Sequence, residues 1–246
     1  MTWTWAWRGE LLKIGTVRGQ WISAFLVTMA IPVTSFLVAT TGGLATGEAT
    51  TSAAATGSLV GLLAFGAWSA MITAGEYAHG TIVNSLTTVP RRSAFYAAKL
   101  SALATASGAA ALISALIALL VVIGIRPPGA YPFGNPASLF GVVFVVIAVA
   151  VTGVSVAVIT RSPTASAAIV VAALLLPKAA SGLLGGLQPW VVGASPGTVV
   201  TEMVGGASVP ASQAFPAGTW AAALTMLGVA VVVVGLGAVA LFRRDG

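Results

Sequence analysis

The stretch GEYAHGTIVNSLTTVPRRSAFYAAK, from Gly75 to Lys99, is the longest polar interval in an otherwise apolar chain. It contains Glu76, the single histidine His79 and three of the eleven basic residues. The apolar runs on either side are long enough to cross a bilayer, which takes about 20 residues. The sequence therefore predicts a polar connection between two membrane-spanning helices.

The composition identifies an integral membrane protein. Of the 246 residues, 58% are hydrophobic and 7% are charged, whereas soluble domains carry about 25% charged residues. The chain has no cysteine, which excludes disulfide and thiol chemistry. The net charge of +6 comes from basic residues at the ends of the apolar runs rather than from one patch. That distribution indicates membrane orientation and argues against a nucleic-acid partner.

Six apolar runs predict an all-α fold with six transmembrane helices. The third run is longer than a bilayer requires, so it is expected to tilt or to project from the membrane. Pro32 is expected to kink the first, because neighbouring helices can satisfy the carbonyl that it frees. The runs are Trp21–Thr40, Gly57–Gly75, Ala98–Ile125, Ala137–Thr160, Ala165–Leu184 and Thr219–Phe242.

The residues before the first span predict a helix that lies on the membrane surface. Their apolar positions recur every three or four residues, as on one face of an α-helix: Trp3, Trp7, Leu11, Ile14 and Val17. Tryptophans among basic residues suit the headgroup layer. A frayed cytoplasmic tail is the alternative. A signal peptide is not expected, because charged residues interrupt the apolar ones.

The basic residues predict the orientation of the chain. If the N-terminus is cytoplasmic, only Arg126 and Lys178 lie outside. This distribution satisfies the positive-inside rule and places both termini in the cytoplasm. Arginine outnumbers lysine, and alanine, glycine and valine abound, which is typical of a GC-rich bacterial genome and suggests a bacterial cytoplasmic membrane. The nine inside positions are Arg8, Lys13, Arg18, Arg91, Arg92, Lys99, Arg161, Arg243 and Arg244.

The segment before the last span, residues 185–218, is too long for a plain turn. Ser195 followed by Pro196 is a helix start signal, and it predicts a short helix over residues 197–204. Such a helix cannot span a bilayer. A re-entrant segment in residues 195–205 that dips into the outer leaflet and an ordinary surface loop both remain open.

The chemistry that is missing from the sequence narrows the function. There is no GxxxxGK[ST] phosphate loop, so ATP binding of that kind is excluded. No group of His, Cys, Asp and Glu has metal-ligand spacing, and Glu76 with His79 is interpreted as a polar helix end rather than a catalytic dyad. No charged residue lies in the middle of a span, where ion-coupled carriers usually need one; sodium sites built from carbonyls and hydroxyls stay open. The chain is predicted to be no enzyme and to hold no metal or cofactor.

The polar interval itself predicts a short amphipathic helix on the membrane surface. Gly80 and Thr81 allow a bend before it, and Pro90 ends it and suits the start of the next helix. Polar residues lie opposite its apolar stripe, which is formed by Ile82, Val83, Leu86 and Val89.

The helix after Pro90 is expected to contact the end of the second span. Arg92 and Lys99 are seven residues apart and share one face of that helix. This face is placed to receive Glu76 in an ion pair that holds the corner together. The alternative is a plain polar loop that satisfies the positive-inside rule.

This order of residues resembles the permeases of type-two ABC exporters. The matching positions are Glu76, Gly80-Thr81, Pro90-Arg91-Arg92 and Lys99. The stretch GELLKIGTVRGQW, residues 9–21, is similar to the start of those permeases, in which an acid and a lysine precede Thr-x-Arg and a tryptophan. The other spans match in topology alone.

The resemblance implies a single transmembrane domain over residues 1–246. The segment between the second and third spans would be the coupling helix, which docks on a separate ATP-binding subunit that carries ATP and magnesium. In chain order the domain comprises an interfacial elbow helix (1–20), spans one and two (21–75), the coupling segment (76–97), spans three to five (98–184), an extracellular loop with re-entrant helices (185–218), and span six with a cytoplasmic tail (219–246).

The resemblance also supplies candidate site residues and partners. Two permeases, identical or different, would pair with two ATPase subunits, and substrate would pass between the permeases along spans two and five. Phe65, Trp68 and Met71 are candidates to line that path, although such residues also pack or face lipid. The coupling residues are Glu76, His79, Gly80, Thr81, Leu86, Pro90, Arg91, Arg92 and Lys99.

The expected function is therefore the permease subunit of an ATP-driven exporter of a hydrophobic or amphiphilic drug, antibiotic or lipid. Two other classes remain open, an ATP-independent secondary carrier and a non-transporting membrane scaffold. The first would transport in vesicles from this chain alone, whereas the exporter subunit would have no activity without its ATPase.

Overall fold

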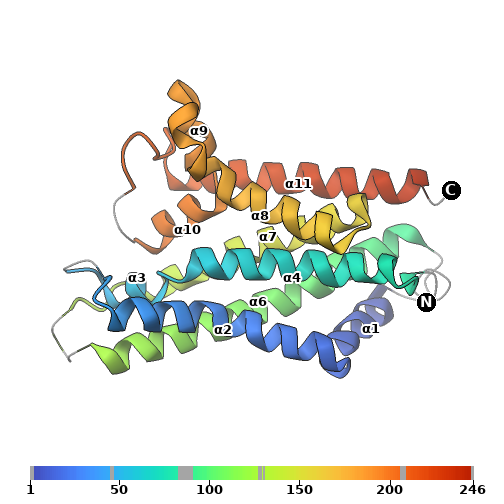
Figure 1. Cartoon of the computed structure of the whole chain (residues 1–246), viewed down its shortest axis with the longest axis horizontal. Helices are drawn as coiled ribbons and strands as arrows, with labels where there is room; N and C mark the ends of the chain where they lie inside the picture. Colours follow the sequence, from blue (N-terminus) through green and yellow to red (C-terminus); the bar gives the residue numbers. More distant parts are fainter. Residues whose placement is uncertain are drawn as a thin grey trace.

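The computed structural model describes residues 3–44, 47–82, 91–126, 129, 131–205 and 209–244. In this part of the chain every regular element is helical, and the long helices lie roughly side by side along one axis (Figure 1). The predicted all-α membrane fold is confirmed. The amphipathic stretch 83–90, which includes Leu86 and Pro90, lies outside the described residues.

Five helical segments in the described residues are long and apolar enough to cross a membrane. The remaining candidate, α8 (Pro163–Ala179), has 17 residues and extends for about 26 Å at 1.5 Å per residue. The five are α2 (Arg18–Thr40), α3 with α4 (Thr50–Ala54 and Ser58–Ala78), α6 (Arg92–Ile125), the 3-10 turn η1 with α7 (Pro136–Ser138 and Leu139–Thr160), and α11 (Thr219–Arg244).

The fifth predicted span, Ala165–Leu184, is too long at its C-terminal end. The α-helix ends at Ala179, and the chain continues as two 3-10 turns, η2 (Ser181–Leu183) and η3 (Gly185–Leu187). Glycine has a low helix propensity, and three glycines between residues 182 and 186 follow Pro177. The apolar residues of this stretch continue beyond the helix, which is why hydropathy alone extended the span.

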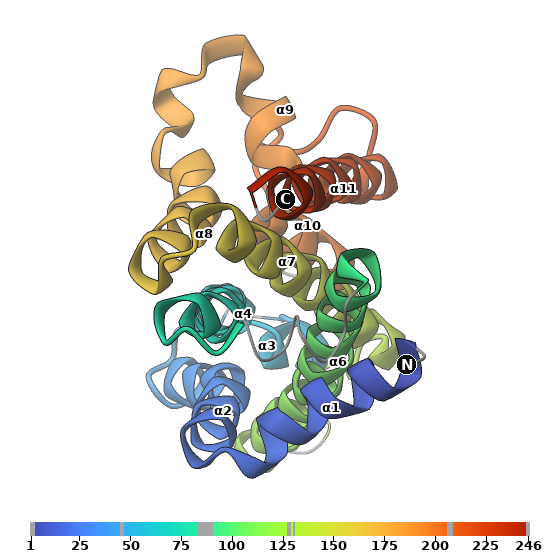
Figure 2. The ribbon, with the colours of Figure 1, turned by 90° about the vertical axis from the view of Figure 1, so that its right-hand side faces the viewer.

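The helix predicted before the first span is α1 (Trp3–Thr16), and its position on the membrane surface stays a prediction. It is separated from α2 by Val17, whose backbone is extended (φ −79°, ψ 115°). Figure 2 shows α1 crossing the ends of α2 and α6, and it packs against both helices. This arrangement brings α1, the last turn of α4 and the first turns of α6 to one end of the bundle, together with the C-terminus (Figure 1).

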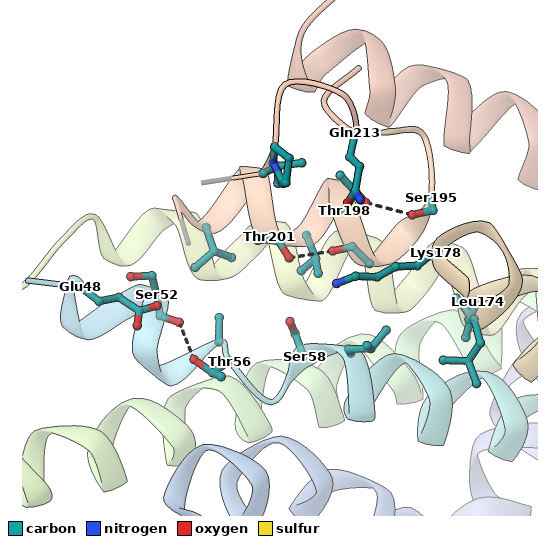
Figure 3. A pocket seen from close by; sticks show the side chains of 18 of the residues that line it. Glu48, Ser52, Thr56, Ser58, Leu174, Lys178, Ser195, Thr198, Thr201 and Gln213 are labelled. Carbon is teal, nitrogen blue, oxygen red and sulfur yellow. Dashed lines mark hydrogen bonds between the residues drawn. The ribbon is translucent and has the colours of Figure 1, made fainter. Parts of the chain in front are cut away.

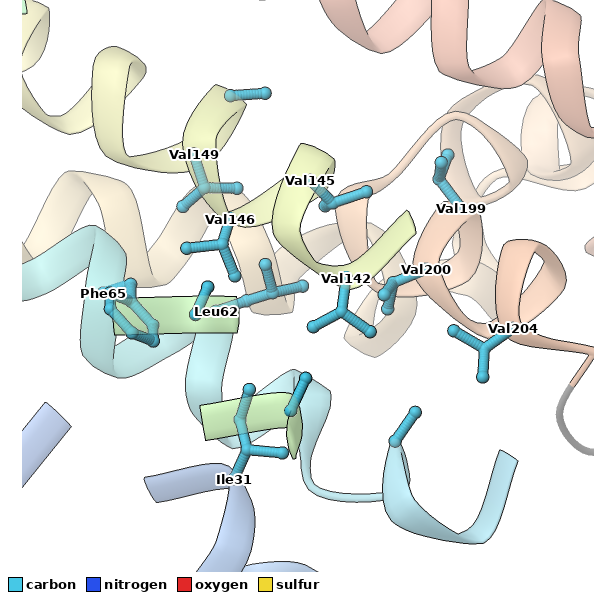
Figure 4. Packing of buried hydrophobic residues seen from close by; sticks show 14 of the residues in the cluster. Ile31, Leu62, Phe65, Val142, Val145, Val146, Val149, Val199, Val200 and Val204 are labelled. Carbon is cyan, nitrogen blue, oxygen red and sulfur yellow. The ribbon is translucent and has the colours of Figure 1, made fainter. Parts of the chain in front are cut away.

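The central helix is α7, which packs against α4, α6, α8, α10 and α11. Its valines interlock with Leu62 and Phe65 of α4 and with residues of α10 (Figure 4). The approach to α4 is close because Gly153 has no side chain: a Cβ there would lie 2.8 Å from the carbonyl oxygen of Gly66. Small residues permit such contacts between membrane helices, where packing drives association.

The chain between α8 and α11 forms two more helices, α9 (Gln188–Gly193) and α10 (Pro196–Val204). The predicted short helix over residues 197–204 is confirmed as α10. Val199 and Val200 are buried against the bundle, and Gly205 ends the helix with a φ of 68°. α10 is thus a packed helix at the end of the bundle opposite α1 (Figure 1), while its depth in the membrane stays a prediction.

Candidate functional site at the helix corner

Four charged residues from three helices meet where α1 crosses α6, beside the end of α4. Lys99 on α6 places its Nζ 2.8 Å from Oε2 of Glu10 and 2.9 Å from Oε2 of Glu76. Lys13 on α1 places its Nζ 2.6 Å from Oε1 of Glu10 and 3.3 Å from Oε1 of Glu76. Each lysine therefore contacts both glutamates. We call Glu10, Lys13, Glu76 and Lys99 the corner cluster.

The cluster is largely withdrawn from solvent. Lys99 is 0% exposed, and Glu10 and Glu76 are each 8% exposed. A buried charge is strongly unfavourable unless it is paired. Two positive and two negative groups balance here, so the burial is tolerated only while α1, α4 and α6 stay together. The ring of Phe95, 5.5 Å from the Lys99 Nζ, adds a cation–π contact.

Local sequence places each member of the cluster. Glu10 and Lys13 are three residues apart, so they share one face of α1. Glu76 lies in the last turn of α4, which ends at Ala78. Lys99 lies two turns into α6, a helix of 34 residues that is about 51 Å long and exceeds the hydrocarbon thickness. The excess length places Lys99 at the bundle end rather than at its centre.

The electrostatics of α1 follow from these contacts. Burial alone raises the pKa of Glu10, but the neighbouring charges and hydrogen bonds of Lys99 and Lys13 outweigh it, so the pKa is lowered from its usual value. Burial alone lowers the pKa of Lys13, but hydrogen bonding and attraction to Glu10 and then Glu76 outweigh it, so that pKa is raised. Both α1 groups are thus held in their charged forms.

The predicted contact between Glu76 and the face of α6 is present, through Lys99. Arg92 is the first residue of α6 and Arg91 precedes it in an extended conformation. Neither arginine makes an ion pair with a residue that the structure describes. Both lie next to the stretch 83–90, so any role in docking stays a prediction.

The predicted bend after the second span lies at Gly80. Its φ of 68° is in the left-handed region that favours glycine. His79 follows the last residue of α4, and its Nδ1 lies 2.7 Å from the Gly75 carbonyl oxygen. The Thr81 hydroxyl donates to the Glu76 carbonyl oxygen over 3.3 Å. His79 thus lies at a polar helix end, as interpreted from the sequence.

The three residues proposed to line the substrate path differ in their exposure to solvent. Phe65 and Trp68 are 0% and 5% exposed and stack edge-to-face, and Trp68 donates its Nε1–H to the Ser23 hydroxyl on α2. Met71 is 52% exposed. Only Met71 therefore offers a side chain to the bundle surface, and the role of all three in a substrate path stays a prediction.

Two members of the cluster, Glu10 and Lys13, were not among the coupling residues expected from the sequence. The available signal was their spacing on the surface helix and the resemblance of residues 9–21 to the start of the permeases. The sequence carried no sign that α1 would cross α6 close enough to bring Glu10 to Lys99, 89 residues later.

Together the fold and the corner cluster define a multi-pass membrane protein with a cluster of paired, largely buried charges at one end of an apolar helix bundle. A family model described as ABC-2 family transporter protein matches residues 8–177, and the chain belongs to this family. It is therefore a permease subunit of an ABC transporter, a transport component rather than a catalyst. Such permeases generally pair with an ATP-binding subunit. The match contains all four residues of the corner cluster. No match is found among curated proteins.

Proposed function

We propose that this chain is the membrane subunit of an ATP-driven exporter, that two permeases form its substrate path, and that a separate ATP-binding subunit docks on the segment 76–97. The family membership supports the permease role. Most basic residues lie at the α1 end of the bundle, and by the positive-inside rule this end faces the cytoplasm, where ATP is available.

The observation that carries the proposal is the corner cluster. Glu76 begins the segment that would dock, at the end of α4, and Lys99 follows that segment near the start of α6. Glu10 and Lys13 join α1 to both. Because separating any of these helices would leave a buried charge unpaired, a force on the docking segment is expected to move the three helices together.

The cargo that fits this chain is hydrophobic or amphiphilic. Outer faces of α2, α6 and α11 expose large apolar side chains such as Phe25, Leu120 and Val231. The charged groups of the spans gather at their ends, so the helices offer no charged binding site near the middle of the membrane. Drugs, antibiotics and lipids share the required chemistry.

The test uses the permease with its ATP-binding subunit, reconstituted in lipid. We expect Glu76→Gln to retain membrane insertion but to lose cargo-stimulated ATP hydrolysis, because the cluster then carries an excess positive charge and α4 separates from α1. Glu76→Asp keeps a negative charge between Lys13 and Lys99 and is expected to retain part of the stimulation. Undiminished stimulation in Glu76→Gln would overturn the mechanism.

The ATP-independent alternative has its own measurement. Vesicles that contain this chain alone are expected to show no gradient-driven uptake of a panel of drugs and lipids. Uptake that depends on a proton or sodium gradient, without the ATP-binding subunit, would replace the proposed function by that of a secondary carrier.

A further inference from the structure

A cavity of about 420 Å³ lies at the end of the bundle opposite the corner cluster. This volume is within the range of about 300–1,000 Å³ that is typical of small-molecule sites. Its walls come from α3, from the starts of α4 and α10, from the end of α8 and from the loop before α11 (Figure 3). We call it the outer pocket.

Several hydroxyl groups face the outer pocket. Ser58, at the start of α4, is 6% exposed, its hydroxyl makes no hydrogen bond to a described residue, and it points into the cavity (Figure 3). Ser195 and Thr198, at the start of α10, are also nine-tenths buried, and their hydroxyls lie 3.2 Å apart. The Ser58 hydroxyl is therefore available to a ligand or a water molecule in the cavity.

The side of the outer pocket nearest the Lys178 ammonium group favours an anion. Lys178, in the last turn of α8, extends its ammonium group across the cavity towards Ser58 and Thr201 (Figure 3). It forms no ion pair with a residue that the structure describes. The N-termini of α4 and α10 also border the cavity, and helix N-termini favour negative groups. Several hydroxyls around one cation suit the several oxygens of a phosphate.

The outer pocket also holds one acid and an apolar wall. The carboxylate of Glu48 lies on the side of the cavity formed by Ser52 and Thr56, away from the backbone of Lys178 (Figure 3). A carboxylate can accept several hydrogen bonds at once, so Glu48 can also contact a cationic group on the same ligand. Leu59, Leu174 and Leu175 line the cavity beside these polar groups, and Leu175 is 41% exposed. An apolar chain attached to the ligand can leave along this wall.

We propose that the outer pocket binds the zwitterionic headgroup of an amphiphile, with its phosphate on Lys178 and Ser58 and its ammonium on Glu48. The binding requires neither the ATP-binding subunit nor transport. A chain that binds no headgroup in the outer pocket could therefore still be the proposed exporter subunit. Conversely, Glu76 variants that lose ATPase coupling are expected to bind the headgroup normally.

The direct test is calorimetric titration of the full-length chain, purified in an uncharged maltoside detergent, with short-chain phosphatidylethanolamine. We expect Lys178→Gln to weaken binding by at least about tenfold, since it removes the charge-assisted contact to the phosphate. Ser58→Ala is expected to weaken it several-fold, and Glu48→Gln to weaken it through the ammonium. Glu202→Gln, a carboxylate of α10 outside the cavity wall, is the matched control and is expected to bind as the wild type does.

Three further probes separate the parts of the ligand. Short-chain phosphatidylglycerol lacks the ammonium and is expected to bind more weakly than phosphatidylethanolamine, with no response to Glu48→Gln. Free phosphoethanolamine lacks the apolar chain and a dodecylammonium salt lacks the phosphate, and both are expected to bind more weakly still.

Two results would overturn the proposal. One is binding of phosphatidylethanolamine that Lys178→Gln and Glu48→Gln both leave unchanged, which would place the lipid elsewhere on the chain. The other is an affinity for a partial ligand that equals the affinity for phosphatidylethanolamine. Equal binding of phosphatidylglycerol would show that the ammonium group is not recognised, and equal binding of free phosphoethanolamine would show that the apolar chain is not recognised. If Lys178→Gln fails to fold, Glu48→Gln measured against Glu202→Gln decides between the same outcomes.

Discussion

The Nζ atom of Lys99 lies 2.8 Å from Oε2 of Glu10, although 89 residues separate the two in sequence. Lys99 has no exposed surface, so this ion pair joins α1 to the start of α6 inside the protein rather than on its surface. The same lysine contacts Glu76 at the end of α4. One buried side chain thus connects the two helices that flank the proposed docking stretch with the helix that precedes the first span.

Removing the charge of Lys99 is expected to destabilise the protein strongly. Lys99→Met leaves two buried carboxylates with only Lys13 between them, and breaking a buried pair in this way costs about 3–5 kcal/mol. Arg18→Met, an exposed cation at the same end of the bundle, is the control and is expected to change the free energy of unfolding by less than about 1 kcal/mol. Unfolding titrations in mixed micelles measure both, and equal effects would contradict a structural role for the cluster.

The stability that the cluster contributes is expected to depend on pH at both extremes. The folded-state pKa of Glu10 lies below the ordinary glutamate value of 4.5, so its contribution is complete above that value and is lost as pH falls through the folded pKa. The folded-state pKa of Lys13 lies above 10.5, so its contribution is complete below that value and is lost as pH rises through the folded pKa.

The measurement is the difference in thermal midpoint between the wild type and Glu10→Gln as a function of pH. This difference is expected to be constant from about pH 5 to 10 and to shrink in acid, because the protonated wild type then resembles the variant. A difference that stayed constant well below pH 4.5 would show that the charge of Glu10 contributes nothing to the folded state.

Much of this architecture could be predicted because membrane-spanning helices are recognisable in the sequence as long apolar runs. The surface helix, the pair of Glu76 with Lys99, and the helix after Ser195 all follow from local patterns of polar and apolar residues. The end of α8 could not be placed this way, because its apolar residues continue past Ala179 into the 3-10 turns. Hydropathy measures the preference for lipid and not the continuity of the backbone hydrogen bonds.

The full corner cluster and the outer pocket depend on distances that local patterns do not contain. In the sequence, Glu10 and Lys13 fit equally well as solvent-exposed charges on a surface helix. Glu10 is buried only because α1 crosses α6. Ser58 and Lys178 lie on different helices, and they meet in one cavity because α8 packs against α4. A site between helices that are distant in sequence can be predicted only once their packing in space is known.

The close contact between α4 and α7 predicts opposite effects of the same substitution at two glycines. Gly153→Ala places a Cβ 2.8 Å from the Gly66 carbonyl oxygen, so the helices must separate, at a cost of about 1–3 kcal/mol. Gly228→Ala on α11 meets nothing within 4 Å and is expected to be neutral or to stabilise by up to about 1 kcal/mol. Thermal midpoints of the two variants test this, and a stabilising Gly153→Ala would contradict the packing.

The bend at Gly80 predicts a variant that folds but couples poorly. Gly80→Ala meets no atom within 4 Å, but the φ of 68° is strained for any residue with a Cβ, at a cost of about 1 kcal/mol. Relief of this strain changes the path of the chain from Glu76 into the docking stretch, so we expect near-normal insertion with reduced cargo-stimulated ATP hydrolysis. Gly75→Ala, inside α4 with only His79 Nδ1 at 4.0 Å, is the matched control and is expected to couple normally. Equal coupling in the two variants would show that the backbone conformation at Gly80 has no part in transmission.

The proposed docking stretch predicts which side chains the ATP-binding subunit needs. Leu86 belongs to the apolar stripe expected from the sequence and Arg91 follows that stripe, so Leu86→Asp and Arg91→Glu are expected to abolish co-purification of the ATP-binding subunit with the permease. Arg243→Glu, a basic residue at the C-terminal end of α11, carries the same change of charge and is expected to leave the complex intact. Retention of the ATP-binding subunit by both docking variants would place the contact elsewhere on the cytoplasmic face. Loss in all three would instead indicate that overall positive charge, rather than the stretch between α4 and α6, holds the partner.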